Sequence, residues 1–167
     1  AVITIGSFDG VHEGHRKILK TLVDKAKAVN GESIVITFDP HPRKVIRPDI
    51  PVHLISSNKE KYHDIMEIGV DHIIEVPFTR SFSLLTAREY VEDFLMKTFS
   101  PHSIIIGYDH QFGHDRKGDI ALLREIVKDT IEVVEISEQL IDDANVSSTK
   151  IRNAIIAGDV ATAKMML

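Results

Sequence analysis

Short apolar runs rich in β-branched residues alternate with helical patterns along the chain, and this alternation limits the possible folds more than any other feature. The expected strands lie at residues 2–5, 33–38, 72–76, 103–107 and 131–136. Between them, apolar residues recur at helical spacing. Short strands that are apolar throughout and separated by helices predict a parallel sheet covered on both faces. We therefore expect an α/β, Rossmann-like fold with five parallel strands and helices on both faces.

Capping patterns and glycines indicate where the helices begin and end. Ser57 and Thr86 each stand three residues before a glutamate, which is the pattern of a capping box. Gly31 follows the first helical pattern, where we expect it to take the left-handed conformation. Residues 39–56 contain too many prolines for a regular element. The expected helices run from the first glycine loop to residue 30, over 57–68, from 86, over 119–128 and 148–157, and from 159.

Composition narrows the class of protein. The chain has 167 residues, a mass of 18.7 kDa and a hydrophobic content of 43%, as expected for one soluble globular domain spanning 1–167. It has no cysteine, which excludes disulfides and a thiol nucleophile and favours a reducing, cytoplasmic location. The net charge of −5 disfavours a nucleic-acid partner, but it leaves room for a local basic site. No apolar run approaches the ~20 residues that span a bilayer, so we expect no membrane partner.

Ligands of such sheets bind beyond the carboxyl ends of the strands, which directs attention to the loops there. Those loops are 6–15, 38–56, 77–85, 107–118 and 137–148. The first of them carries the most specific pattern and leads directly into a helix; it reads Gly6-Ser7-Phe8-Asp9-Gly10-Val11-His12-Glu13-Gly14-His15. Its glycine spacing fits neither the dinucleotide fingerprint nor the P-loop, and its histidines are three apart, not four as in zinc proteases.

We interpret this glycine loop as a cradle for a nucleotide. Glycines let the backbone approach a phosphate, and the start of the following helix presents free N–H groups. His12 and His15 can donate hydrogen bonds to the same anion. The alternative is a tight strand-to-helix turn with surface histidines.

Hydroxyl side chains and an arginine gather at the start of the helix expected at 148–157. Free N–H groups, the hydroxyls of Ser148 and Thr149 and the guanidinium of Arg152 would together bind phosphate oxygens. Simple N-capping by Ser147 or Ser148 is the alternative, and the two interpretations are compatible.

Two further loops at this edge of the sheet supply candidates. Asp109 follows the fourth strand and can accept a hydrogen bond from a ribose hydroxyl, while Gly107 would let adenine lie against the backbone. His110 and His114 lie in the same loop and are assigned no role, because surface histidines are commoner there than metal ligands. Residues 38–42 form a rigid loop next to an aromatic side chain, which suits either a ligand or a plain crossover.

Together these motifs resemble the FMN adenylyltransferase domain of prokaryotic FAD synthetases, within the HxGH nucleotidyltransferase superfamily. The stretches that carry the resemblance are the glycine loop, Phe38-Asp39-Pro40-His41-Pro42, Gly107-Tyr108-Asp109 with Phe112-Gly113 and Gly118-Asp119, and Ser147-Ser148-Thr149-Lys150-Ile151-Arg152. The resemblance covers essentially the whole chain. It implies that ATP and FMN react to give FAD and pyrophosphate, with Mg²⁺ bridging the phosphates and no protein metal ligands assigned.

The resemblance also implies roles for individual residues. The catalytic residues would be His12 and His15. The ATP-binding residues would be Gly6, Phe8, Asp9, Gly10, Gly14, Gly107, Asp109, Ser148, Thr149 and Arg152. The flavin-binding residues would be Phe38, Pro40, His41, Pro42 and Phe112.

Members of this family usually continue into a riboflavin kinase module, and none of that module is expected in this chain. Two alternatives remain open from the sequence. The chain could be another HxGH nucleotidyltransferase with a different acceptor, or a non-catalytic domain that binds a nucleotide or a flavin.

Overall fold

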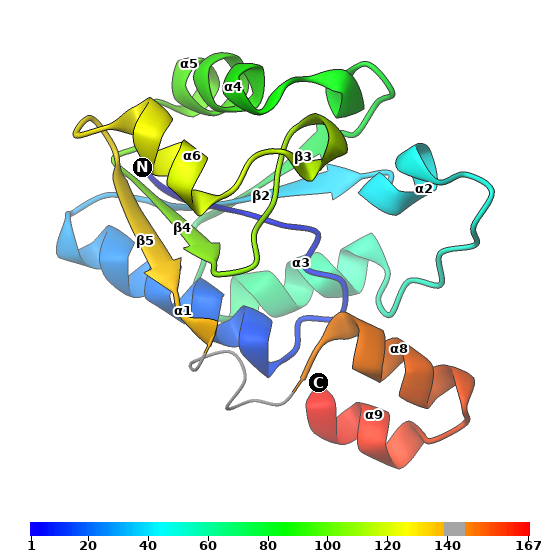
Figure 1. Cartoon of the computed structure of the whole chain (residues 1–167). Coiled ribbons are helices and arrows are strands. Elements are labelled where there is room, and N and C mark those ends of the chain that lie inside the picture. Colours follow the sequence, from blue (N-terminus) through cyan, green and yellow to red (C-terminus); the bar gives the residue numbers. More distant parts are fainter. Residues whose placement is uncertain (139–145) are drawn as a thin grey trace.

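Five parallel strands form the central sheet of the structure, a computed structural model in which residues 1–138 and 146–167 are described (Figure 1). The strands are β1 (Val2–Ile5), β2 (Ser33–Asp39), β3 (His72–Pro77), β4 (Ser103–Gly107) and β5 (Glu132–Ile136). They lie in the order β3-β2-β1-β4-β5, and every pairing between neighbours is parallel. The predicted fold class is therefore confirmed. Because the order reverses between β1 and β4, the loops after these two strands flank a crevice that can bind a ligand.

Helices cover both faces of the sheet, as predicted (Figure 1). One face packs against α1 (Glu13–Ala28) and α3 (Asn58–Glu67). The other face packs against α4 (Ala87–Glu89), the π-helical segment η2 (Tyr90–Met96), α5 (Lys97–Phe99) and α6 (Ile120–Val127). Among the described residues, the remaining helical elements are α2 (Pro42–Ile46), the 3-10 turns η1 (Phe82–Leu84) and η3 (His114–Arg116), α8 (Ser148–Ile156) and α9 (Val160–Met166).

The core lies on both sides of the sheet because successive strand residues face opposite ways. In β4, Ile104 and Ile106 pack against the α4–α6 face, whereas Ile105 packs against the α1 face. All three side chains are almost completely buried. A strand that is apolar on both faces is what an all-parallel sheet requires.

Both predicted capping boxes are formed, while one predicted helix end is different. Ser57 accepts a hydrogen bond from the backbone N–H of Glu60, whose carboxylate accepts one from the backbone of Ser57, and Thr86 makes the same pair of contacts with its glutamate. The left-handed residue after α1 is Asn30, with φ of 50°, so the prediction for Gly31 is wrong. Asparagine is the residue other than glycine that most readily takes this conformation.

Residues 42–46 form the short helix α2, so the prediction of no regular element across 39–56 is wrong here. Pro42 stands at the first helical position, where its missing N–H would have had no partner within the helix. His41 accepts a hydrogen bond from the backbone N–H of Arg43 at 3.2 Å. The prolines thus start this helix instead of preventing it.

Gly113 holds the loop after β4 against the start of α4. Its φ is +73°, and a Cβ there would lie 2.6 Å from the Cα of Ala87. We expect Gly113→Ala to lower the free energy of unfolding by about 3 kcal/mol, because a strained backbone and an atomic overlap add together. Gly158 is the matched control, since its φ is +79° and a Cβ there would meet nothing within 4 Å. Urea denaturation should show a loss of only about 1 kcal/mol for Gly158→Ala; equal losses would contradict the overlap.

Candidate active site

A cleft of about 380 Å³ opens at the carboxyl edge of the sheet, where the strand order reverses. Four segments of the described part of the chain line it: the glycine loop with the start of α1, the start of α2, the residues after β4, and the start of α8. This volume lies within the range of small-molecule sites. Loop 77–85 contributes no lining residue, and positions 139–145 of the fifth predicted loop lie outside the described residues.

His12 is the N-cap of α1 and is only 6% exposed. Its Nδ1 accepts a hydrogen bond from the backbone N–H of His15 at 3.3 Å, so the proton of the neutral ring lies on Nε2. Burial lowers the pKa of His12 to about 4, and the opposing effect of Asp9 is smaller. His12 is therefore a neutral hydrogen-bond donor at the wall of the cleft near neutral pH.

His15 stacks on His12 with ring centroids 3.7 Å apart and an interplanar angle of 17°. Its Nδ1 lies 3.4 Å from the carbonyl oxygen of Gly10, and a carbonyl can only accept, so Nδ1 carries the proton. Burial, with a further effect of His12, lowers the pKa of His15 to about 3. The rings of Phe8 and His15 also contact each other in an edge-on arrangement, with centroids 5.2 Å apart. The three-residue spacing thus stacks two neutral rings on one helix face.

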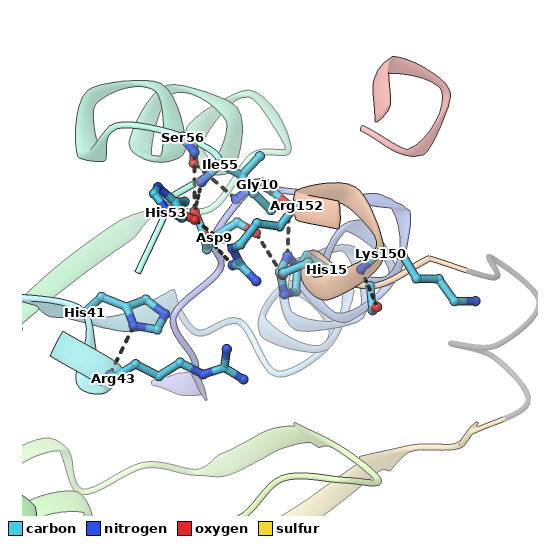
Figure 2. Close-up of polar contacts among 12 residues, drawn as sticks. Asp9, Gly10, His15, His41, Arg43, His53, Ile55, Ser56, Lys150 and Arg152 are labelled. Atoms are coloured by element: carbon cyan, nitrogen blue, oxygen red, sulfur yellow. Dashed lines mark hydrogen bonds and ion pairs between the residues drawn. The ribbon is translucent and has the colours of Figure 1, made fainter. Parts of the chain in front are cut away.

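Asp9 joins three segments that are far apart in the sequence (Figure 2). Its Oδ1 accepts hydrogen bonds from the backbone N–H groups of Ile55 and Ser56, at 2.8 and 3.3 Å. Its Oδ2 pairs with Nη2 of Arg152 at 2.7 Å, and the two side chains are 5% and 15% exposed. Arg152 also donates from Nε to the carbonyl oxygen of His53. The Asp9 carboxylate therefore fixes the glycine loop against residues 53–56 and α8.

The start of α8 combines capping with exposure to the cleft. Ser147 accepts a hydrogen bond from the backbone N–H of Lys150 at 3.3 Å, so it is the N-cap. The hydroxyl of Ser148 donates to the backbone carbonyl of Asp9 at 3.0 Å. Thr149 lines the cleft beside them. Capping leaves the start of this helix facing the same space as the two histidines.

The structure brings all the predicted polar residues and Gly14 to the cleft, whereas the other predicted glycines, the prolines and the aromatic residues do not line it. Those that line it are Asp9, His12, Gly14, His15, His41, Asp109, Ser148, Thr149 and Arg152. Those that do not are Gly6, Phe8, Gly10, Phe38, Pro40, Pro42, Gly107 and Phe112. Phe8 and Phe38 are buried core residues, although Phe38 also lines a second, small hollow. Phe112 is 6% exposed and stacks on Tyr90 in the core, at 5.3 Å.

Sequence reasoning missed several residues that line the cleft, namely Ser7, Ile18, Arg43, Tyr108 and Val146. Arg43 is the most informative of these, because it is an exposed cation one residue after the proline-rich loop. The sequence does contain a signal for Arg43, because this arginine directly follows a loop that was already a candidate for ligand binding. Ile18 reads only as a residue on the apolar face of α1, and nothing in the sequence distinguishes it from the core.

Lys61 is a further cation that sequence reasoning did not single out. It is 5% exposed and donates from Nζ to the hydroxyl of Thr37 at 3.2 Å, and Thr37 donates to the backbone carbonyl of Ser7. It borders a hollow of about 10 Å³ beside the cleft, with room for roughly one water. Burial lowers the pKa of Lys61, although Glu75, Asp39 and Asp9 partly oppose this. The ammonium group is thus linked to the glycine loop through the hydroxyl of Thr37.

We expect the stability conferred by Lys61 to depend on pH. Because its pKa is lower in the folded state, the unfolded chain binds more protons between that value and the ordinary lysine value near ~10.4. Stability of the parent chain should therefore rise with pH in this window relative to Lys61→Met. Urea denaturation between about pH 7 and about pH 10 measures the difference. Lys59→Met, which removes an exposed lysine of α3, is the control; parallel curves for all three proteins would contradict the expectation.

The fold and the cleft define the class of this chain. A Rossmann-like sheet that presents two stacked histidines at the first helix, opposite the hydroxyl-rich start of α8, is the arrangement of an HxGH nucleotidyltransferase domain. The sequence profile of FAD synthetase matches residues 1–150. The chain belongs to the FAD synthetase family, and the resemblance seen in the sequence is confirmed.

The names of two relatives agree with this assignment. The chain is 32% identical, over 99% of its length, to the bifunctional riboflavin kinase/FMN adenylyltransferase of Escherichia coli K12, of which it covers 53%. It is 28% identical to a putative enzyme of the same name from Geobacillus thermodenitrificans and covers 89% of it. A solved structure described as a macrolide-efflux protein from Streptococcus pneumoniae matches 99% of this chain and 54% of its own, with 27% identity and a TM-score of 0.83. The chain therefore spans about half the length of the first and third of these proteins.

The described helices give no indication of a transmembrane segment. Within residues 1–138 and 146–167, none is both long and apolar enough to cross a bilayer.

Proposed function

We propose that this chain transfers the adenylyl group of ATP to FMN, giving FAD and pyrophosphate. The family match and the names of the relatives support adenylyl transfer to FMN. The observation that carries the proposal is the stacked pair His12–His15 at the start of α1, which shares one cleft with the start of α8. Helix starts and imidazole N–H groups are suited to a chain of phosphates.

The ATP side of the cleft would be formed by α1 and α8. A phosphate oxygen of FMN attacks the α-phosphorus of ATP, the new P–O bond forms, and the bond to the leaving pyrophosphate breaks. Near neutral pH a phosphate monoester is already largely a dianion, so the attack needs no strong base. His12 would donate from Nε2 to the α-phosphoryl oxygens as their charge grows. Ser148, Thr149 and Arg152 would bind the leaving phosphates.

The FMN side would be formed by α2 and the loop before it. Nδ1 of His41 accepts the backbone N–H of Arg43, so the proton of the neutral ring lies on Nε2. Burial, the largest of several effects, lowers the pKa of His41 and keeps this ring neutral near pH 7. The guanidinium of Arg43 lines the same cleft. These two donors would receive the FMN phosphate, opposite the groups that bind ATP.

Mg²⁺ would enter this cleft with ATP. Among the described residues, no group of three or more histidine, aspartate or glutamate side chains is arranged to hold a metal ion. Mg²⁺ commonly keeps several waters and binds through substrate phosphates, where it offsets their negative charge. We therefore propose phosphate-bound Mg²⁺ with few protein ligands.

We also propose that residues 1–167 form one nucleotidyltransferase domain and that the full-length protein joins it to a riboflavin kinase module. The bifunctional name of the Escherichia coli relative, of which this chain covers 53%, supports this arrangement. This chain alone should then adenylylate FMN without phosphorylating riboflavin. A cytoplasmic location remains part of the proposal and is supported by the absence of cysteine.

A product assay tests the proposed function. The protein is incubated with ATP and Mg²⁺ and either FMN or riboflavin, and FAD and pyrophosphate are measured by chromatography and a coupled assay. We expect FAD to form when FMN is the acceptor and not when riboflavin is. Product formed only with CTP or with another phosphorylated acceptor would show a different nucleotidyltransferase. Nucleotide binding without any product would show a non-catalytic domain, and either result would overturn the proposal.

A further inference from the structure

The two stacked histidines offer different groups to a ligand. Nδ1 of His12 accepts the backbone N–H of His15, so His12 has a neutral N–H donor at Nε2. Nδ1 of His15 faces the carbonyl oxygen of Gly10 and must donate to it. Nε2 of the neutral His15 ring is therefore a lone pair and can only accept. One ring of the pair is ready to bind an anion, and the other is not.

The surroundings of His15 favour a donor at that nitrogen once a polyphosphate is present. His15 lines the cleft, and phosphate oxygens only accept hydrogen bonds near neutral pH. A neutral Nε2 would place a lone pair against these oxygens. Within residues 1–138 and 146–167, the other titratable or charged groups that line the cleft are His12 and Asp9 from the first helix and its loop, His41 and Arg43 at the start of α2, Tyr108 and Asp109 after β4, and Arg152 from α8.

We propose that His15 takes up one proton at Nε2 when a nucleoside triphosphate binds, while His12 stays neutral. This inference rests on the proposed function of the cleft. The proton comes from the solvent, and it converts the only lone pair of the ring into a second donor. The charge also strengthens the existing hydrogen bond from Nδ1 to the carbonyl oxygen of Gly10.

The stacking explains why one proton is taken up and not two. The ring centroids are 3.7 Å apart, so two imidazolium cations would repel each other strongly. His12 already donates to a phosphate without a charge, whereas His15 donates only with one. In the empty cleft, burial and the neighbouring His12 lower the pKa of His15 to about 3, and bound phosphates act in the opposite direction.

Proton uptake makes nucleotide affinity depend on pH in a defined direction. The free ring of His15 is neutral above about pH 3, and the bound ring is charged until the pH exceeds its raised pKa. The complex therefore holds more protons than the separate partners, and raising the pH weakens binding. The dissociation constant should rise by up to roughly tenfold per pH unit in this window.

Calorimetry counts the protons directly. The probe is α,β-methylene ATP with Mg²⁺, which cannot be cleaved at the reacting bond. It is titrated at about pH 7, where its phosphates are themselves largely deprotonated, in buffers of different ionisation enthalpy. We expect an uptake of about one proton by the parent chain and about none by His15→Gln, whose amide donates without a charge. His12→Gln is the matched control and should retain the uptake. Uptake that persists in His15→Gln, or that disappears in His12→Gln instead, would overturn the proposal.

Nitrogen NMR of the imidazole rings separates this inference from the proposed function. In the free protein His15 should be neutral with its proton on Nδ1, and with the probe both of its nitrogens should carry protons. A protein that forms FAD while His15 stays neutral in the complex overturns the proton uptake alone. A protein that does not bind the probe overturns both proposals, and the product assay then identifies which nucleotide, if any, the cleft accepts.

Discussion

Replacing His12 with asparagine is expected to lower kcat for FAD formation about 100-fold or more while leaving the fold intact. Asparagine is a good N-cap residue, and its Oδ1 can accept the backbone N–H of His15 as Nδ1 of His12 does. The substitution removes Nε2–H, the donor that we propose stabilises the charge developing on the α-phosphoryl oxygens. Steady-state FAD formation and urea denaturation together measure the two effects.

His12→Ala is the companion variant, because it removes both the donor and the cap. Its kcat should fall as far as that of His12→Asn, and its free energy of unfolding should fall by about 1 kcal/mol more. An asparagine variant with an unchanged kcat would show that His12 acts only as a cap. The comparison therefore assigns the two nitrogens of one ring to two separate tasks.

The fold could be predicted because its signals are local. A short apolar strand and a serine or threonine three residues before a glutamate each act over a few residues. The two misjudged places are also local in origin. A proline at the first position of a helix is tolerated, whereas a proline in a helix interior breaks it. Pro42 is at the first position of α2, and this could be recognised only by knowing where the helix begins.

The candidate site was predictable where it depends on loop ends and was not predictable where it depends on contacts across the fold. His12, Asp109 and Ser148 follow from their places after β1, after β4 and at a helix start, all at one edge of the sheet. Phe112 belongs to a motif, yet its ring packs inward on Tyr90, and side-chain direction in a loop has no sequence period. The burial of Lys61 likewise depends on strands that are distant in the sequence.

The Asp9–Arg152 ion pair is expected to contribute more to stability than any other ion pair described in the structure. Asp9→Asn should lower the free energy of unfolding by about 3 kcal/mol, because one partner of a mostly buried pair remains without its counter-charge. Asparagine can still accept the backbone N–H groups of Ile55 and Ser56. Asp93→Asn breaks the exposed pair with Lys97 and should change the urea midpoint little.

Much of the loss in Asp9→Asn should come from the unpaired guanidinium, so the double variant Asp9→Asn/Arg152→Met should regain part of it. If the double variant is instead less stable than Asp9→Asn, the ion pair is not the source of the effect.

The same series examines the role of Arg152 toward ATP. The guanidinium has five N–H donors, and the structure uses Nε and Nη2 toward His53 and Asp9, which leaves donors for phosphate oxygens. Asp9→Asn should therefore raise the KM for ATP by loosening Arg152, with kcat less affected, because the proposed role of Asp9 is to position a group that would bind phosphate.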